Sequence, residues 1–188
     1  MVRSAFDARR AQLLTVGKHI FSARAYDDVS TEEIAAEAGI SIGLLYHYFS
    51  NKKGFYVATI RAAADDLLDA VRFAPGKPLA ASAPAALGAF LTFVETNAAL
   101  YQGLMRGGVG ADREVHTILE GVRTTLMERV FEAAGIPASP ELRLQLYGWL
   151  GLVEFMSLRW LTHQEASRDE LLGLMLANVP PSLLEIQA

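Results

Sequence analysis

The stretch 29–53, VSTEEIAAEAGISIGLLYHYFSNKK, most constrains the fold of this chain because it contains two helix starts within one short segment. Ser30 has the hydroxyl group that caps a helix N-terminus, and Glu33 lies where its carboxylate can return to the Ser30 amide. The first helix should therefore begin at Thr31. Ser41 offers the same kind of cap to a second helix that runs through LLYHYF.

A turn of only three residues, 39–41, joins the two predicted helices. Gly39 can adopt the left-handed conformation that ends a helix without a side-chain penalty. A short glycine turn of this kind holds two helices at roughly 90 to 120°, and it needs a small residue such as Ala35 where the helices cross. The spacing alone fits an αα corner in any helical protein as well as it fits a helix-turn-helix.

The composition of the second helix favours the helix-turn-helix that binds DNA. Leu45 takes the core face, while Tyr46, His47 and Tyr48 crowd the rest of the short helix and Lys52 follows it. Tyrosine hydroxyls, a capped helix N-terminus and lysine ammonium groups are common donors to DNA phosphates. The first turn of a recognition helix meets the edges of the bases.

At these residues the chain resembles the tetracycline-repressor (TetR) family of bacterial transcription regulators. The family pattern, roughly T-x-x-x-I-A-x-x-A-G-V-S-x-G-x-L-Y-x-Y-F-x-x-K, appears here as TEEIAAEAGISIGLLYHYFSNKK, and the resemblance spans about residues 9–56. It implies an all-α fold with an N-terminal three-helix DNA-binding head that contains the helix-turn-helix. A C-terminal helical ligand-binding and dimerisation bundle should follow.

The same resemblance implies a homodimeric, ligand-responsive repressor that a small, mainly apolar effector releases from a palindromic operator. Its partners would be double-stranded DNA, the effector and a second copy of the chain. The alternative is a helical small-molecule-binding or adaptor protein without sequence-specific DNA activity. We expect the DNA-binding domain to span 1–51 and the effector-binding and dimerisation domain to span 52–188, connected by a helix over about 52–73.

Nine residues are the expected DNA contacts. They are Thr31, Ser41, Ile42, Gly43, Leu44, Tyr46, His47, Tyr48 and Lys52. Four of them are expected to contact phosphates and so position the protein on the DNA: Thr31, Tyr46, Tyr48 and Lys52. Gly43 lets the backbone approach closely, and His47 can contact a phosphate or a base. Ile42 and Leu44 stand where the family often has polar residues, so readout there would use apolar contact with thymine methyl groups.

The charge is distributed unevenly along the chain. The net charge is −4, but residues 1–56 carry 7 basic and 6 acidic side chains, whereas residues 57–188 carry 10 and 15. The excess of positive charge in the N-terminal part has the sign that a DNA-binding head needs, although it is small. Few phosphate contacts per subunit imply modest non-specific affinity, and therefore reliance on binding as a dimer.

Composition bounds the remaining classes. A chain of 188 residues with 52% hydrophobic content can bury a sizeable core, and it has no cysteines for disulfides or a thiolate metal site. The N-terminus lacks the layout of a secretion signal, so we expect a cytoplasmic protein. The longest uninterrupted apolar stretch, 146–153, is far shorter than the roughly 18 to 20 residues of a membrane span.

Helical periodicity continues through the rest of the chain, with no β pattern and no internal repeat. Helices are expected at about 6–24, 52–73, 85–96, 98–106, 112–134, 140–163 and 168–177, with a turn near residues 180–181. The segment 75–84, PGKPLAASAP, is predicted to be a loop because it is rich in residues that stop helices. The glycines of the joint at 103–110 punctuate helices, since no strand precedes them and no Gly-Lys-Ser/Thr follows.

Large adaptable apolar side chains fill the C-terminal part, and we expect several of them to line an effector pocket. The candidates are Phe90, Phe93, Tyr101, Met105, Met127, Phe131, Trp149, Phe155 and Met156. Ordinary core packing is the alternative for each of them. The composition indicates an apolar effector and does not select its chemical class.

The predicted helix 140–163 is apolar on nearly all sides, which is typical of a helix buried on two faces. One face would pack on its own domain and the other on a second subunit, with Gly148 and Gly151 allowing close approach. The resemblance implies a four-helix dimer interface made by helices 140–163 and 168–177. An internal helix of a monomer is the alternative.

An enzyme is the competing class. The four histidines, His19, His47, His116 and His163, show no metal-ligand spacing of the H-E-x-x-H kind, and no catalytic cluster emerges. A run of three acidic residues in 65–69 fits a solvated helix face. We therefore expect no catalytic residue, no metal and no cofactor.

Overall fold

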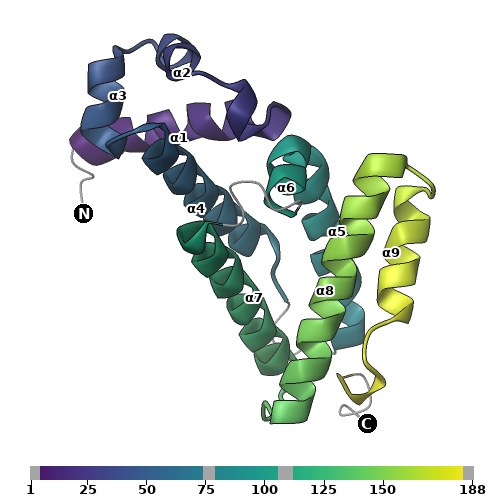
Figure 1. The fold of residues 1–188 in the computed structure, drawn as a ribbon. Coiled ribbons are helices and arrows are strands. Elements are labelled where there is room, and N and C mark those ends of the chain that lie inside the picture. Colours follow the sequence, from purple (N-terminus) through teal and green to yellow (C-terminus); the bar gives the residue numbers. More distant parts are fainter. Residues whose placement is uncertain (1–4, 74–78, 106–111, 184–188) are drawn as a thin grey trace. The chain divides into compact units, whose positions relative to one another are not determined.

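The computed structural model describes residues 5–73, 79–105 and 112–183, and within these ranges its secondary-structure elements are helices joined by short turns (Figure 1). The elements are α1 (Ala5–Ala23), η1 (Tyr26–Asp28), α2 (Thr31–Glu37), α3 (Ile42–Phe49), α4 (Lys52–Ala70), α5 (Leu79–Thr96), α6 (Ala98–Met105), α7 (Arg113–Ala134), α8 (Pro140–His163), α9 (Arg168–Ala177) and η3 (Pro181–Leu183). The all-α prediction is confirmed. The bounds predicted for α8 and α9 agree with the structure, whereas α4 ends three residues earlier than predicted.

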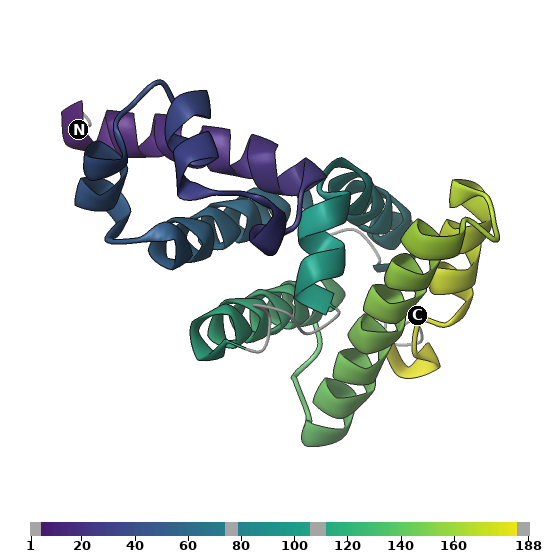
Figure 2. The ribbon, with the colours of Figure 1, turned by 45° about the horizontal axis from the view of Figure 1, so that its top comes forward.

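The chain divides into two compact units. The first unit comprises Met1–Asp66 and Thr96–Ile118, and the second comprises Leu67–Glu95 and Leu119–Ala188. In the first unit, α2 and α3 pack beside α1 and α6 packs against α1, as the two views show (Figure 1, Figure 2). The functional division that we expected after residue 51 stays a prediction.

Aromatic side chains hold the core of the first unit together. The Phe21 ring is fully buried on α1 and lies 4.8 Å from the Tyr56 ring and 6.1 Å from the Phe55 ring of α4. A Cβ atom on Gly17 would lie 2.4 Å from the Thr59 hydroxyl, so α1 and α4 approach closely there. Full burial of a side chain such as Phe21 or Phe55 stabilises the fold by about 1.5–3 kcal/mol.

The core of the second unit lies between α7, α8 and the segment that follows α9. Its buried members are Met127, Val130, Phe131, Ala134, Ile136, Leu146, Val179 and Leu183. Arg129 of α7 donates hydrogen bonds to the carbonyl oxygens of Leu68 and, at 3.0 Å, of Val71, so its guanidinium satisfies carbonyl groups at the end of α4. Arg168 ties α9 to α5 through the Gly88 carbonyl oxygen at 2.7 Å.

The start of α5 differs from the sequence prediction. Residues 79–84 were predicted to be loop, but α5 begins at Leu79 and has Pro84 inside it. Proline within the first two turns removes a single backbone hydrogen bond, and the buried side chains of Ala83, Ala86 and Leu87 offset that loss. Residues 74–78 and the glycines of the predicted joint at 107–110 lie outside the described residues.

No single helix of the described residues is both long enough and apolar enough to cross a membrane. Residues 80–96 of α5 together with residues 98–105 of α6 have the length and composition of a membrane span, but only as a bent pair.

Candidate nucleic-acid interface

The start of α2 is fixed by reciprocal hydrogen bonds. The Glu33 amide donates to the Ser30 hydroxyl at 3.1 Å, and the Ser30 amide donates to the Glu33 carboxylate at 2.7 Å. The Ser30 amide and then the Arg24 side chain, 2.9 Å away, lower the pKa of Glu33 from 4.5 to about 2. Val29 and Ile34 are buried beside this cap, at 1% and 0% exposure, and have the spacing of a hydrophobic staple. The predicted capping box is confirmed.

The turn between α2 and α3 is the one expected from the sequence. Gly39 has a φ of 61°, and the Ile40 amide donates to the Ala35 carbonyl oxygen at 3.0 Å, which closes the end of α2. The Leu44 amide then donates to the Ser41 hydroxyl at 3.1 Å and begins α3. The helix-turn-helix geometry therefore rests on local hydrogen bonds that the sequence itself specifies.

The outward face of α3 carries most of the predicted recognition residues. Leu45 is fully buried, whereas Leu44 and Tyr46 are 38% and 40% exposed. His47 is also exposed, as are Ser41 and Gly43, while Ile42 is half-buried. Among described atoms outside the backbone of α3 and the adjacent residues, a Cβ placed on Gly43 would meet only the Ser41 hydroxyl oxygen within 4 Å, at 3.9 Å, so these residues leave room for a close approach.

Tyr46 links the recognition helix to the first turn of α2. Its hydroxyl donates to the Thr31 hydroxyl oxygen at 3.4 Å. The structure therefore brings together two of the residues expected to contact phosphates. Two hydroxyl groups beside the N-terminus of α2 form a polar patch of the kind that donates to a DNA backbone.

A cluster of three rings occupies the end of α3 nearest the start of α1. The Phe6 ring stacks on Tyr48 with 4.6 Å between centroids and meets the edge of His47 at 6.1 Å. Phe6 is 46% exposed. Sequence reasoning missed its contribution, because a lone phenylalanine at the start of a predicted helix gives no signal for contact with a helix forty residues later.

Lysines at the start of α4 are engaged by neighbouring side chains. The Lys52 ammonium lies 4.1 Å from the centroid of the Tyr26 ring, a cation–π contact that leaves its charge available to a phosphate. Lys53 forms an ion pair with Asp112, which raises the pKa of Lys53 and lowers the pKa of Asp112. The positive charge of Lys53 is therefore compensated within the first unit.

The turn between α3 and α4 depends on a glycine that the sequence analysis did not single out. A Cβ atom on Gly54 would lie 2.1 Å from the Phe49 carbonyl oxygen, so no larger residue fits without a backbone shift. The Gly54 amide donates to the Asn51 side chain at 2.7 Å, which caps α4, and Ser50 between the helices has a φ of 65°. This turn sets the direction of α3 relative to α4.

The predicted effector residues fall in both units. Tyr101 and Met105 belong to the first unit, and the others belong to the second. Met127 and Phe131 are buried in the α7–α8 core, where Trp149 packs against them. Phe90 is buried, and Phe93 and Met156 are half-buried. Phe155 is 72% exposed, so in the single chain it does not line an enclosed pocket.

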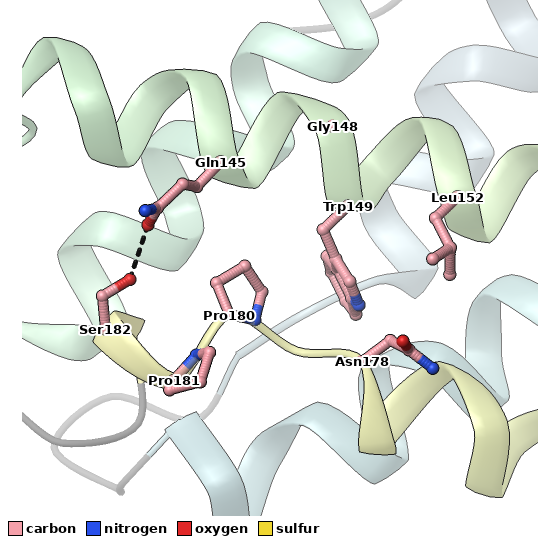
Figure 3. Close-up of a pocket in the computed structure, with 8 residues that line it drawn as sticks. All are labelled: Gln145, Gly148, Trp149, Leu152, Asn178, Pro180, Pro181 and Ser182. Atoms are coloured by element: carbon pink, nitrogen blue, oxygen red, sulfur yellow. Dashed lines mark hydrogen bonds between the residues drawn. The ribbon is translucent and has the colours of Figure 1, made fainter.

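A groove of about 540 Å³ runs between α8 and the segment after α9 (Figure 3). Its lining residues are Gln145, Gly148, Trp149, Leu152, Asn178, Pro180, Pro181 and Ser182. The Ser182 hydroxyl donates to the Gln145 side chain at 2.6 Å, and the Trp149 indole N–H donates to the Met175 carbonyl oxygen at 3.1 Å. Trp149 is the predicted effector residue in this groove.

An apolar face of α8 and α9 is exposed in the single chain. Leu144 and Phe155 are 74% and 72% exposed, Tyr147 is 43% exposed, and Leu174 of α9 is 50% exposed. Among the described residues, no atom outside the backbone of α8 and the adjacent residues lies within 4 Å of a Cβ placed on Gly148 or Gly151. Large exposed apolar patches of this kind mark interaction surfaces.

Two family descriptions match this chain. Residues 13–59 match "Bacterial regulatory proteins, tetR family", and residues 79–179 match "Tetracyclin repressor-like, C-terminal domain". The crystal structure of a tetR-family transcriptional regulator from Streptomyces coelicolor is 32% identical, with a TM-score of 0.87 over 94% of this chain and 80% of that chain. The chain therefore belongs to the TetR family of DNA-binding transcriptional regulators, which are not enzymes.

Other likenesses cover a smaller part of the chain or show the fold alone. The chain is 39% identical over 66 residues to the HTH-type transcriptional activator FasR of Mycolicibacterium smegmatis, which is 35% of this chain and 30% of that relative. The matched segment thus spans about a third of FasR. A structure of the transcriptional regulator FadR from Bacillus subtilis in complex with stearoyl-CoA aligns with a TM-score of 0.69 at 15% identity, over 95% of this chain and 99% of that chain.

Proposed function

We propose that this TetR-family regulator is a homodimeric repressor that a small, mainly apolar effector releases from a palindromic operator. The observation that carries the proposal is the division of α3 into a buried side at Leu45 and Phe49 and an outward side at Leu44, Tyr46 and His47. An exposed, capped helix at the end of a tight turn has the geometry that enters a DNA major groove.

Within this proposal the interface residues divide into two groups. Tyr46 and Thr31, joined by their hydroxyl groups, position the protein on phosphates, together with Tyr48 and Lys52. Base edges are read by the first turn of α3. This second group comprises Ser41, Ile42, Gly43 and Leu44, with His47 able to serve in either group. Apolar contact from Ile42 and Leu44 favours thymine methyl groups.

The exposed apolar face of α8 and α9 supports the homodimer. Burying Leu144, Phe155 and Leu174 against a second copy removes from water side chains that the single chain leaves 50% or more exposed. Gly148 and Gly151 let a second helix approach closely because no other described segment comes within 4 Å of a Cβ placed on either glycine. A two-fold axis would place two recognition helices about 34 Å apart, one turn of DNA.

The effector is proposed to bind in the second unit. Phe90, Phe93 and Met156 are buried or half-buried side chains of the kind that line apolar pockets. FadR of Bacillus subtilis, which has the same fold, was crystallised with stearoyl-CoA, and that ligand contains a long apolar chain. The effector releases DNA only to the extent that it binds the DNA-free form more tightly than the DNA-bound form.

Selection of binding sites from random duplexes, with the full-length protein, tests the DNA-reading part of this proposal. We expect a palindromic consensus, and we expect the Ile42→Ala, Leu44→Ala double variant to select a different one because the apolar contacts are lost. The matched control is Glu37→Gln, an exposed position at the end of α2. An unchanged consensus for the double variant would refute readout by these two side chains.

The sign of regulation needs a separate measurement, since FasR is described as an activator. A reporter gene placed behind the selected operator should be silent when the protein is present and active when its gene is deleted. Lower expression after deletion would contradict the repressor role.

A further inference from the structure

The ring cluster at the end of α3 includes Phe6, which is not one of the proposed DNA contacts. His47 and Tyr48 are neighbours in sequence and meet edge to face at 5.5 Å. Phe6 of α1 contacts both rings, stacked on Tyr48 at 4.6 Å with an interplanar angle of 28° and at 83° to His47. A single exposed phenylalanine is ordinary, but here it touches two residues that the proposed interface uses.

A second contact between the same two helices fixes the position of Phe6. The Arg10 guanidinium lies 5.3 Å from the centroid of the Phe49 ring, at the end of α3. Phe6 and Arg10 are four residues apart on α1, so their side chains share one face of the helix. The first turns of α1 therefore contact successive rings of α3 at Tyr48 and Phe49.

We propose that Phe6 is a positioning residue for DNA binding that holds the Tyr48 and His47 rings in the orientation that meets the DNA. This inference rests on the proposed role of those two residues at the interface. Free Tyr and His side chains sample several rotamers, and binding must select one of them. A ring stacked on Tyr48 and in edge contact with His47 restricts that choice before DNA arrives, so less ordering is left to the binding step.

If Phe6 served only to stabilise the fold, removing its ring would lower the melting temperature. Its side chain is 46% exposed, whereas Leu13 and Phe21 on the same helix are 2% and 0% exposed and anchor α1 in the core. Removing the Phe6 ring should therefore leave the melting temperature nearly unchanged. A positioning role predicts weaker DNA binding without a loss of stability.

The test measures the affinity of the full-length protein for its selected palindromic duplex by fluorescence anisotropy. Phe6→Ala should weaken binding about tenfold, given the size of ring-pair and side-chain ordering effects. Phe6→Tyr keeps the ring and should restore the affinity, while Phe6→Leu, of similar hydrophobicity but without a ring, should not. In the free protein, the His47 ring protons should shift in the NMR spectrum of Phe6→Ala.

Comparison of a triple variant with a double variant separates this inference from the proposed interface. Since Phe6 acts through its neighbours, Phe6→Ala combined with Tyr48→Ala and His47→Ala should bind no more weakly than the variant that lacks only those two rings. Additive losses would overturn positioning, as would a fall in melting temperature that accounts for the lost binding. Unchanged binding by Phe6→Ala, with weak binding by the Tyr48→Ala, His47→Ala variant, overturns this inference alone. If neither weakens binding, the proposed role of Tyr48 and His47 fails as well.

Discussion

Two closely packed glycines of the first unit and two glycines on α8 of the second unit have opposite surroundings. A Cβ atom on Gly17 or Gly54 in the first unit would lie 2.4 Å or 2.1 Å from an atom of another residue, so the chain around them is already closely packed. Around Gly148 and Gly151 on α8 of the second unit, the described residues place no atom within 4 Å of the same position, apart from the backbone of α8 itself and the adjacent residues. Gly17 and Gly54 therefore lie at close contacts within the first unit, whereas the described residues leave space beside Gly148 and Gly151.

This difference indicates which interactions each region uses. The helix-turn-helix is held by contacts between residues close in sequence, such as Ser30 with Glu33 and Ser41 with Leu44. The exposed side of α8 carries Leu144 and Phe155, which the described residues leave largely accessible to solvent. Perturbing the first region should therefore alter stability or DNA contact directly, and perturbing the second should alter assembly.

The largest effect is expected from Phe155→Glu. The side chain is 72% exposed, so the single chain should fold, but a carboxylate buried unpaired in the proposed interface costs about 3–5 kcal/mol. We expect a monomer by size-exclusion chromatography with light scattering at micromolar concentration, and a loss of operator affinity of about 100-fold or more. The control is Thr124→Glu, which adds the same charge at an exposed position of α7. A dimeric Phe155→Glu protein would disprove this interface.

Alanine at two glycines sharpens the comparison directly. Gly54→Ala forces a Cβ against the Phe49 carbonyl oxygen and should destabilise the protein by about 2–3 kcal/mol, the range of overpacked sites. Gly148→Ala, made in the monomeric Phe155→Glu background, should stabilise α8 by about 0.5–1 kcal/mol because alanine favours helices. Urea unfolding of both variants in that background measures the two changes. Equal changes in the free energy of unfolding for the two variants would contradict the difference in packing between Gly54 and Gly148.

The sequence could predict those parts of the structure that local chemistry determines. Serine caps at Ser139 and Ser167 mark the starts of α8 and α9, and both helices have the predicted bounds. The start of α5 was mispredicted because burial of side chains after Leu79 outweighs the proline signal. The contact of Phe6 with α3 depends on which helices meet, and no local pattern encodes that.

A smaller effect is expected from Tyr46→Phe, which removes the hydroxyl that joins α3 to Thr31. Because a phosphate contact carries no sequence information, binding to all duplexes should weaken alike, by about 1 kcal/mol or fivefold. Anisotropy titrations with several operator variants measure this change. A loss confined to one variant would instead assign Tyr46 to base readout.

The smallest effect concerns the pH dependence of the α2 cap. The folded pKa of Glu33 is about 2, below its ordinary value of 4.5, so its carboxylate stabilises the fold fully above pH 4.5. That contribution is lost as the pH falls from about 4.5 to about 2. The melting temperature of Glu33→Gln should therefore lie below that of the native protein at pH 7, and the gap should narrow in this range. A gap that widens on acidification would contradict the predicted direction of this pH dependence. The control is Glu37→Gln on the same helix.

Binding of the full-length protein to its selected palindrome, measured as the spacing between the half-sites is changed, tests most directly whether two α3 helices read DNA together. Inserting about five base pairs rotates one half-site by half a turn of the duplex, which a two-fold pair of recognition helices cannot follow. We predict that this insertion lowers the affinity to that of a single half-site. Equal affinity for the original and the lengthened palindrome would contradict a dimer with one recognition helix in each half-site.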